Sequence, residues 1–380
     1  MIEPPRHDVA QKLATAAAEL GFELFGITAA VSPEGFSNLI RWIGAGYAAD
    51  MEYFQDRLEA YGDLNLVLQD VRSVVVLGFP YRTDPPASAA GHQGRIARYA
   101  WGTADYHDLI HPRLKQLKQI INAEFPAEQS RGVVDSAPLL EREFAQLAGL
   151  GWAGKNSLLI NRQQGSYFFL SCLLTTLALP PSKPHQTDHC GTCRRCLDAC
   201  PTDAFVAPGV LDSRRCISYQ TIENRGVIPI ELREPIGNWL FGCDICQEVC
   251  PWNRFGNDAS DAALSPDERS NPIDLLELIT LDEEAFRKRF RSTPLWRPRR
   301  RGLIRNAAIC LGNAQEPLAV EGLIQRLADD EPVIRGAAAW ALGKIPGPRS
   351  QAALRQRLEV ETDDSVRSEI SLAMQAVSIA

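Results

Sequence analysis

Residues 190–201 read CGTCRRCLDACP, in which four closely spaced cysteines are followed by a proline. The pattern C-x2-C-x2-C-x3-C-P is the spacing with which bacterial ferredoxins bind 4Fe–4S clusters. Three thiolates two residues apart can wrap a compact loop around three corners of one cuboidal cluster. The fourth thiolate sits farther on and points away, so it ligates a second cluster. The run therefore predicts a pair of clusters.

A second run, CDICQEVCP at residues 243–251, lacks its first cysteine locally, and Cys216 can take the missing place from a distance. With Cys216 included, eight cysteines provide two sets of four cluster ligands. The first expected set is Cys190, Cys193, Cys196 and Cys250. The second expected set is Cys200, Cys216, Cys243 and Cys246. The other two cysteines, Cys172 and Cys310, lie in apolar segments, where a buried inert thiol is the usual state.

Zinc and reactive thiols are the alternatives to iron–sulfur clusters. Paired C-x2-C units also suit zinc, which is held by four ligands in one place. A zinc site would leave the third cysteine of the first run unexplained, together with both prolines. The spacing therefore favours two 4Fe–4S clusters.

The composition is that of a globular protein with ample material for a core. The chain has 380 residues, of which 45% are hydrophobic, and this length suggests two or three domains. We read no secretory signal at the N-terminus, and the apolar segment 167–180 is too short and too rich in threonine to span a membrane as a helix. We therefore expect a cytoplasmic protein that contacts no membrane. In that reducing compartment, ten cysteines indicate metal binding or catalysis rather than disulfides. The net charge of −7 means that any nucleic-acid binding must be local.

Hydrophobic periodicity predicts alternating helices and strands before the cysteines. Helices are expected at 8–20, 108–125 and 138–149, and strands at 22–28, 73–79, 157–160 and 167–178. We interpret residues 1–180 as one α/β domain. Residues 179–189 contain several prolines and are expected to form a linker. The cysteine region occupies 190–255, and 256–272 is expected to be a polar connection.

The last 80 residues contain a repeat. The segments LIRNAAICLGN (303–313), VIRGAAAWALGK (333–344) and SVRSEISLAMQA (365–376) each place an arginine near the start of an alanine-rich helix. Partner helices are expected between them, at a period of 30 to 32 residues. Paired helices at this period indicate a short HEAT-like solenoid. An unrelated helical bundle is the alternative.

The glycine-rich stretch GLGWAGKN (149–156) matches two nucleotide-binding patterns only in part. The dinucleotide pattern needs a strand before it and a helix after it, whereas here a helix precedes and a strand follows. The phosphate-binding loop needs Ser or Thr after its lysine, and this position is Asn156. We therefore expect these glycines to allow close approach of some other flat ligand.

Several motifs occur together in one order: ARYAWGTADYHD (97–108), VDSAPLLERE (134–143), GWAGKNSLLI (151–160), the two cysteine runs and LIRNAAICLGN. In this combination the chain resembles the epoxyqueuosine reductases over nearly its whole length. The resemblance implies an α+β multidomain fold. Its expected domains are a cobalamin-binding catalytic domain (1–180), a ferredoxin-type double 4Fe–4S domain (181–272) and a HEAT-like repeat domain that contacts tRNA (273–380).

The resemblance also implies an activity. Members of this family reduce epoxyqueuosine to queuosine at the wobble position of tRNA, the last step of queuosine biosynthesis, with cobalamin fed by two 4Fe–4S clusters. Removing the epoxide oxygen consumes two electrons and two protons. A reductive dehalogenase-like reductase, an electron-transfer iron–sulfur protein and a protein-binding scaffold are the alternatives. The dehalogenases are typically exported with a twin-arginine signal, which we do not read in this sequence. An electron-transfer protein or a scaffold would leave one or more of the domains unexplained.

Matching motifs carry the family's functional residues onto this chain. The implied corrin contacts are Arg57, Arg98, Tyr99, Tyr106, His107, Trp152, Lys155, Asn156 and Ser157. Each could instead have an ordinary core or surface role. The implied proton donor is Asp135, which could alternatively cap the helix expected to begin near Pro138. Because an ordinary aspartic acid is ionised at neutral pH, we expect burial or the bound substrate to keep this carboxyl protonated.

A local excess of basic residues predicts where tRNA binds. Between Arg287 and Arg305 there are nine Lys or Arg and no Asp or Glu. We expect this segment to contact the backbone of the anticodon stem-loop, with Phe290 and Trp296 available to stack on bases. The predicted tRNA contacts are Arg297, Arg299, Arg300, Arg301 and Arg305. The alternative is a solvated basic face paired with Asp282, Glu283 and Glu284. The expected partners are tRNA carrying epoxyqueuosine and a low-potential electron donor, with the protein acting as a monomer.

Overall fold

The computed structural model describes residues 6–84, 89–259, 261–267 and 271–377. The chain divides into two compact units, each assembled from separate segments. The first unit comprises 1–84, 104–213 and 245–264, and the second comprises 85–103, 214–244 and 265–380. The sequence predicted three consecutive domains, whereas here the cysteine region is divided between the two units. In the described part of the chain, none of the helices is both long and apolar enough to cross a membrane.

The first unit contains a four-stranded sheet with the order β1-β2-β7-β4. Its strands are β1 (Leu24–Ala29), β2 (Ser73–Pro80), β4 (Ser130–Val133) and β7 (Phe168–Thr175). Every pairing is antiparallel, and β2 and β7 pair along their whole length. The sequence predicted β1, β2 and β7 correctly, and the pairings make this an antiparallel sheet.

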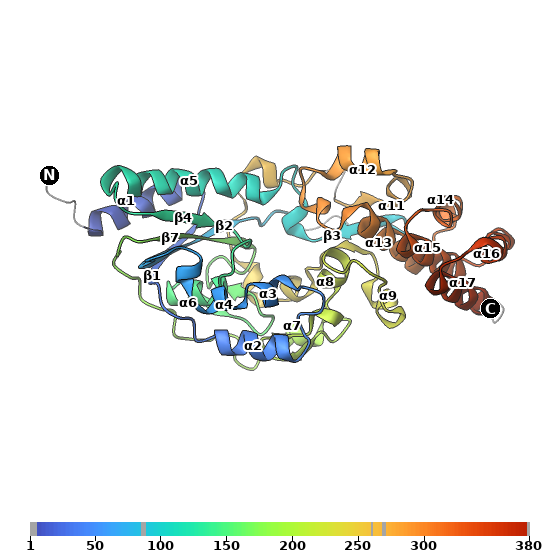
Figure 1. Cartoon of the computed structure of the whole chain (residues 1–380), viewed down its shortest axis with the longest axis horizontal. Coiled ribbons are helices and arrows are strands. Elements are labelled where there is room, and N and C mark those ends of the chain that lie inside the picture. Colours follow the sequence, from blue (N-terminus) through green and yellow to red (C-terminus); the bar gives the residue numbers. More distant parts are fainter. Residues whose placement is uncertain (1–5, 85–88, 260, 268–270, 378–380) are drawn as a thin grey trace. The chain divides into compact units, whose positions relative to one another are not determined.

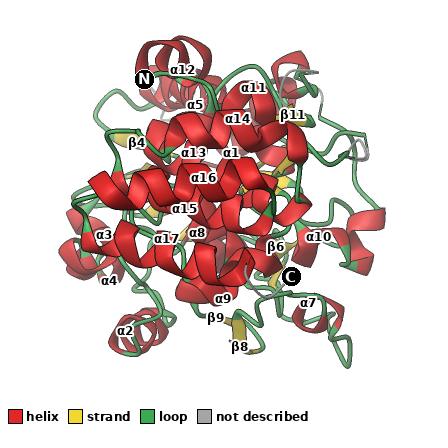
Figure 2. Ribbon diagram, turned by 90° about the vertical axis from the view of Figure 1, so that its right-hand side faces the viewer, coloured by secondary structure: helices red, strands yellow, loops and turns green. Residues whose placement is uncertain are grey.

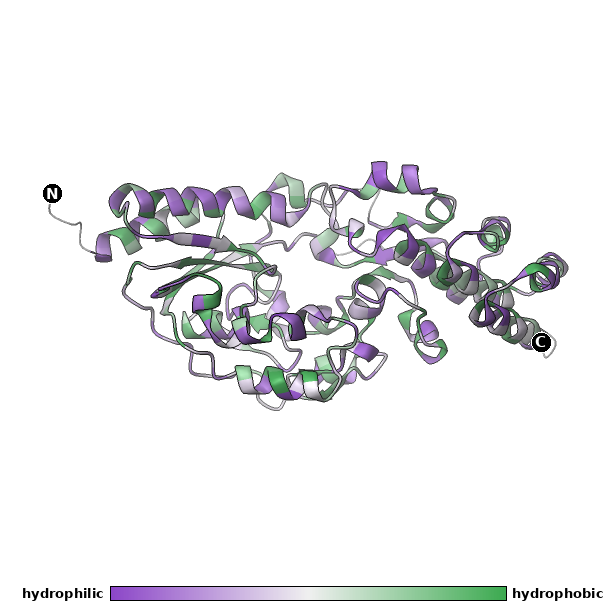
Figure 3. Ribbon diagram, in the orientation of Figure 1, coloured by the Kyte–Doolittle hydropathy of each residue, from purple (hydrophilic) through white to green (hydrophobic). Residues whose placement is uncertain are grey.

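Helices cover both faces of this sheet, as Figure 1 shows. Helix α1 (Arg6–Glu19) and helix α5 (Tyr106–Glu124) lie on one face, and α6 (Glu141–Leu147) lies on the other. Because side chains alternate along a strand, Val74 and Val76 of β2 pack with Phe144 of α6. Helix α5 carries hydrophobic and hydrophilic residues on different sides, as expected for a helix half exposed to water (Figure 3).

Short elements complete the first unit. They are α2 (Phe36–Gly44), α3 (Tyr53–Asp56), α4 (Leu58–Gly62), the hairpin of β5 (Trp152–Ala153) and β6 (Leu159–Ile160), α7 (Arg195–Asp198), the hairpin of β8 (Phe205–Ala207) and β9 (Val210–Leu211), and α10 (Ile245–Glu248). The predicted linker at 179–189 contains neither helix nor strand. The predicted polar connection at 256–272 lies partly outside the described residues.

The second unit has a small sheet with the order β10-β3-β11. These strands are β3 (Gln93–Ile96), β10 (Trp239–Phe241) and β11 (Ile273–Asp274). Four helices precede the repeats in sequence: α8 (Ile217–Ile222), α9 (Ile230–Ile236), α11 (Leu275–Leu278) and α12 (Glu283–Phe290).

The repeats of the second unit form two layers of helices (Figure 2). One layer is α13 (Arg299–Ala314), α15 (Pro332–Lys344) and α17 (Asp364–Val377), and the other is α14 (Val320–Arg326) and α16 (Pro348–Val360). The Leu-Gly pairs of the repeat have a packing role. A Cβ atom at Gly312 would lie 2.9 Å from Cα of Ala341, and one at Gly343 would lie 2.8 Å from Cα of Ala373. Glycine thus allows successive helices of the layer to approach closely.

Candidate active site

Asp135 lies in the turn that follows β4, before α6 begins at Glu141. Its side chain is 48% exposed and its backbone has φ +40°, a left-handed conformation that non-glycine residues adopt at a cost. The N-cap position of α6 is Leu140, with no side-chain cap. The alternative role of Asp135 as a helix cap is therefore wrong, because helix α6 starts later than the sequence predicted.

A chain of hydrogen bonds joins Asp135 to the start of α5. Nε2 of His107 lies 2.8 Å from Oδ1 of Asp135, and Nδ1 of His107 lies 2.7 Å from Oδ1 of Asp105. The backbone N–H of His107 also donates to Oδ1 of Asp105, the N-cap residue of α5. Asp105 therefore fixes both the helix start and the orientation of the imidazole ring.

The two carboxylates keep the imidazole protonated. The hydrogen bond to Asp105, followed by that to Asp135, raises the pKa of His107 to about 10. Burial works against ionisation of Asp105, but its hydrogen bonds with His107 outweigh burial and lower the pKa of that carboxyl. At neutral pH, His107 is therefore an imidazolium whose Nε2–H donates to Asp135.

Tyr106 contacts Asp135 from the same turn of helix α5. Its hydroxyl group donates to Oδ2 of Asp135. Its ring stacks on the ring of His107, with centroids 4.2 Å apart, and on Phe169 of β7, with centroids 4.3 Å apart. Stacking on a strand holds the phenol in place, so both oxygens of Asp135 have positioned hydrogen-bond donors.

The half-buried carboxyl of Glu141 contacts the Asp135 turn. The backbone N–H of Asp135 donates to Oε1 of Glu141 at 2.9 Å. Burial, and then the charge of Asp135, raises the pKa of Glu141 to about 8. Nη1 of Arg57 donates to the carbonyl of Ser136, 3.0 Å away. These contacts hold the strained turn from both sides.

The structure brings together only some of the residues expected to bind the corrin. Arg57, Tyr106 and His107 surround the Asp135 turn. Arg98 and Tyr99 belong to the second unit. The carbonyl of Ser157 accepts a hydrogen bond from Arg142, the exposed neighbour of Glu141.

The remaining three expected contacts hold the cysteine runs. Nε1 of Trp152 lies 3.5 Å from Sγ of Cys190. Nζ of Lys155 donates to the carbonyls of Gly191 and Cys193 at 2.5 Å and 3.0 Å. The amide of Asn156 donates to the carbonyl of Cys246, 3.3 Å away. The buried Trp152 fits the core role weighed as its alternative, and for all three a role towards cobalamin stays a prediction.

The four thiols of the first expected cluster set line one cavity of about 710 Å³, with Pro251 and Trp252 beside them. Burial, and then the proximity of the other three thiols, raises the pKa of Cys196. Mutual repulsion of this kind is relieved when an iron cluster binds the sulfurs. The donor set therefore fits a 4Fe–4S cluster.

The second expected set stays a prediction, because Cys200 and Cys246 belong to the first unit and Cys216 and Cys243 to the second. The two leftover thiols are buried, as expected. Burial raises the pKa of Cys310 to about 12 and also raises that of Cys172. Both stay protonated and inert at neutral pH.

Two of the five predicted tRNA contacts have structural roles in the second unit. Arg305 is 1% exposed, and its guanidinium donates to the backbone carbonyls of Gln220, Asn224 and Gly226. The prediction that Arg305 contacts tRNA is wrong, because a buried guanidinium whose donors already bind backbone carbonyls cannot reach a phosphate. Arg300 is mostly buried and forms an ion pair with Asp329.

The other three predicted arginines have side chains that reach the surface. Arg297 pairs with Glu223 at 3.0 Å, Arg301 is 3.8 Å from Glu331, and Arg299 lies over the ring of Trp296. The basic segment is thus partly paired, although not with the acids suggested by the sequence. Asp282 instead caps α12.

The two aromatic residues expected to stack on bases differ in exposure. Phe290 is buried, so its expected stacking on bases is wrong. Trp296 is only half-buried, but its ring stacks on Phe286 with centroids 5.5 Å apart.

Sequence reasoning missed Asp105 and Glu141. Both lie inside motifs that had been singled out, ADYHD and LLERE. An acid two residues before a histidine at a helix start was the available signal for Asp105. No local signal identifies Glu141, because its role depends on burial under the Asp135 turn.

Family models match three segments of the chain. Residues 62–136 match the model described as "Epoxyqueuosine reductase QueG, DUF1730". Residues 189–253 match the 4Fe-4S double cluster binding domain, and residues 301–375 match HEAT repeats. The cluster and repeat predictions are thereby confirmed.

Relatives that align with most of the chain decide its family membership. An epoxyqueuosine reductase of Pseudomonas aeruginosa is 42% identical over 344 residues, covering 88% of this chain and 94% of the relative. The chain belongs to the epoxyqueuosine reductase family. The family member of Escherichia coli is 36% identical over 345 residues, covering 89% of this chain and 90% of that protein. Epoxyqueuosine reductases use cobalamin together with two 4Fe–4S clusters, so the cofactors implied by the sequence follow from membership.

Solved structures of the family share the fold. The chain aligns with a crystal structure of epoxyqueuosine reductase bound to an epoxyqueuosine-modified tRNA-Tyr stem loop, with a TM-score of 0.92, 31% identity, and coverage of 98% of this chain and 99% of that one. It also aligns with the Bacillus subtilis enzyme, whose catalytic aspartate loop is swung out of the active site, with a TM-score of 0.89, 30% identity, and coverage of 97% and 99%.

Proposed function

We propose that this chain reduces epoxyqueuosine to queuosine in tRNA, with Asp135 as the residue that protonates the departing epoxide oxygen. The reaction takes two electrons and two protons and releases the oxygen as water. The observation that carries this assignment is the convergence of His107 and Tyr106 on the carboxylate of Asp135. Family membership supplies the substrate class.

The contacts of Asp135 account for its proton supply. A general acid needs a proton at the pH of the reaction, within hydrogen-bond distance of the group that it protonates. His107 holds such a proton on Nε2, 2.8 Å from Oδ1 of Asp135. Transfer from His107 to Asp135 loads the acid, and Asp105 stabilises His107 while it is charged. The Asp105–His107–Asp135 chain is thus the proposed proton relay.

The cofactors supply the electrons. When bound, cobalamin would supply a cobalt centre able to act on an epoxide carbon, and the 4Fe–4S clusters would supply it with electrons. The side chains proposed to face the corrin from the first unit are Arg57, Tyr106 and His107, which carry the cationic and hydroxyl groups that suit its amide and phosphate substituents. The first cluster is proposed to bind Cys190, Cys193, Cys196 and Cys250, and the second to bind Cys200, Cys216, Cys243 and Cys246.

The proposed tRNA contacts are reduced to Arg297, Arg299 and Arg301, whose guanidinium groups reach the surface. Phosphate contacts of this kind hold the nucleic acid without reading its sequence.

A low-potential carrier is proposed as the electron donor, and the protein is proposed to act as a monomer in the cytoplasm.

The decisive experiment is a single-turnover reaction. The protein, loaded with cobalamin and reduced under anaerobic conditions, is incubated with tRNA that contains epoxyqueuosine. The nucleosides are then analysed by mass. Loss of one oxygen atom from the modified base is expected, and unchanged epoxyqueuosine with a fully reduced protein would refute the proposal.

A further inference from the structure

The cavity that holds the first cluster set has an unusual charge distribution. It is lined by the thiols of Cys190, Cys193, Cys196 and Cys250 and by four cationic side chains, Lys155, Arg162, Arg195 and Arg254. Within the described part of the chain, none of the lining residues carries a carboxylate. The chain as a whole has a net charge of −7, so this concentration of positive charge is local.

Three of these cations are available to a partner. Arg162, Arg195 and Arg254 are exposed, and none of them forms an ion pair with the carboxylates that the structure describes. Lys155 differs, because its ammonium group donates to the carbonyls of the cysteine loop and thus supports that loop. The adjacent Arg194 pairs with Asp198 at 3.4 Å.

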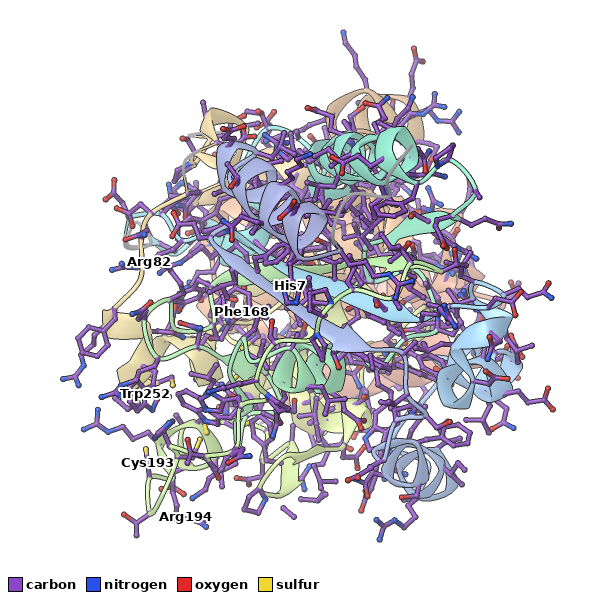
Figure 4. All side chains as sticks on the ribbon, turned by 90° about the vertical axis from the view of Figure 1, so that its left-hand side faces the viewer. His7, Arg82, Phe168, Cys193, Arg194 and Trp252 are labelled. Atoms are coloured by element: carbon purple, nitrogen blue, oxygen red, sulfur yellow. The ribbon has the colours of Figure 1, made fainter. Side chains whose placement is uncertain are left out.

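Two aromatic residues line the same cavity as the cations. Phe255 is 50% exposed, and Trp252 is half-buried with its ring 5.2 Å from that of Trp152. In Figure 4, Cys193 and Trp252 lie on the same side of the molecule, near its outline. Exposed aromatic and cationic residues that line one cavity with a set of redox-active ligands have the composition of a transient protein interface.

We infer that this surface, made of Arg162, Arg195, Arg254, Trp252 and Phe255, is the docking site for a small acidic one-electron carrier protein. The inference rests on the proposed function, which requires an electron donor. It specifies the chemical class of that donor and the surface to which it binds. In each encounter the carrier loses one electron and the first cluster gains it, with no proton or group transferred. Two encounters supply the two electrons that one epoxide consumes.

Charge and electron transfer together favour a protein carrier over RNA. A carrier must bring its redox centre close to the cluster, and the cavity places the cluster thiols beside the surface. Weak electron-transfer complexes bury small interfaces and depend on complementary charge for fast encounter. RNA would also be attracted to the arginines, but RNA binding would not explain why they line the same cavity as the cluster thiols.

The test reverses two of the exposed cations and leaves the cysteine runs unchanged. The variant is Arg162→Glu with Arg254→Glu, and the control, Lys115→Glu with Arg72→Glu, changes the net charge equally at exposed sites outside the cavity. Reduced flavodoxin, an acidic one-electron carrier, is mixed anaerobically with the oxidised protein, and cluster absorbance is followed by stopped flow. Iron content and reduction by dithionite should match wild type in both variants.

The cavity variant should be reduced by flavodoxin at least about tenfold more slowly than wild type at low salt, and the difference should shrink as salt is added. The control should behave like wild type. Equal rates for variant and control would overturn the inference, as would a variant that loses tRNA binding instead.

Dithionite replaces the carrier in a separate turnover assay. If wild type then fails to convert epoxyqueuosine, the proposed function fails, whereas conversion with unaltered flavodoxin rates refutes only the docking site.

Discussion

Nε2 of His107 lies 2.8 Å from Oδ1 of Asp135, and the opposite nitrogen of the same ring lies 2.7 Å from Asp105. A cationic ring between two carboxylates stores a proton within reach of the proposed acid. The arrangement therefore separates two tasks. Asp135 delivers the proton, and His107 keeps it available at pH values at which carboxylic acids are normally ionised.

Asp135→Asn should abolish most of the turnover. The amide keeps the size of the side chain but cannot deliver a proton, so the single-turnover rate should fall by about a hundredfold or more, the usual contribution of a general acid. Iron content, cobalamin binding and tRNA binding should be unchanged. Ser136→Ala is the matched control, since it alters the next side chain of the same turn. A near-normal rate for Asp135→Asn would leave the proton source unassigned.

Asp105→Asn should shift the pH dependence of the reaction. The pKa of His107 is raised to about 10, mainly by Asp105, so the proton store is full at neutral pH and empties as pH rises through about 10. Without the Asp105 carboxylate the pKa of His107 falls, and the alkaline decline of the single-turnover rate should move to lower pH. The same linkage applies to folding: the stabilisation by protonated His107 is fully present below about pH 6.5 and is lost as pH rises through about 10.

The matched control for this prediction is Asp108→Asn, an exposed acid in the first turn of the same helix. Its pH–rate profile should coincide with that of wild type. Coincident profiles for Asp105→Asn and wild type would show that His107 is not the proton store.

Cysteine substitutions should separate the cluster thiols from the inert ones. Anaerobically purified protein should be brown and contain about eight irons per chain, as two 4Fe–4S clusters require. Cys250→Ala removes a thiol of the first set, so about four irons should be lost. Cys310→Ala removes a thiol buried in α13, and all the iron should remain. A colourless protein that contains zinc would contradict the cluster assignment.

Charge reversal should map the tRNA surface. Arg299→Glu with Arg301→Glu is expected to weaken tRNA binding and to reduce the slope of log K against log salt by about one or two units, because phosphate contacts release counterions. The control Lys115→Glu with Arg355→Glu makes the same charge change at exposed sites elsewhere. Measurement of affinity at several salt concentrations decides the question. Equal affinities for both variants would place the RNA site elsewhere.

The sequence predicted features that depend on spacing or periodicity. The buried strands and the repeat helices follow from hydrophobic periodicity, and the double-cluster domain follows from the cysteine spacing. The buried, structural role of Arg305 could not be predicted in this way. Its neighbours in sequence are basic, but its partners are carbonyls about eighty residues earlier, and only the folded chain brings them together. Counting local charge therefore overestimated the tRNA surface.

Asp135 shows the same limit at the active site. The motif implied its role, but the helix after it was expected to begin near Pro138, whereas it begins at Glu141. Asp135 lies in the turn before this helix with a positive φ, and its carboxylate contacts Tyr106 and His107 of α5. Burial of Glu141 and the contact with His107 both depend on packing across the sheet, which has no signature in a linear pattern.

The buried Arg305 has a consequence for how freely the repeats can be exchanged. This side chain and its neighbour Asn306 bind the carbonyls of Gln220, Thr221, Asn224, Gly226 and Leu240. A chain cut before α13 would lose these donors and leave several carbonyls of the segment after Cys216 without partners. The helical tail is therefore not a detachable module. Grafting it from another protein would require the graft to reproduce the arginine–asparagine pair in the middle of its first long helix.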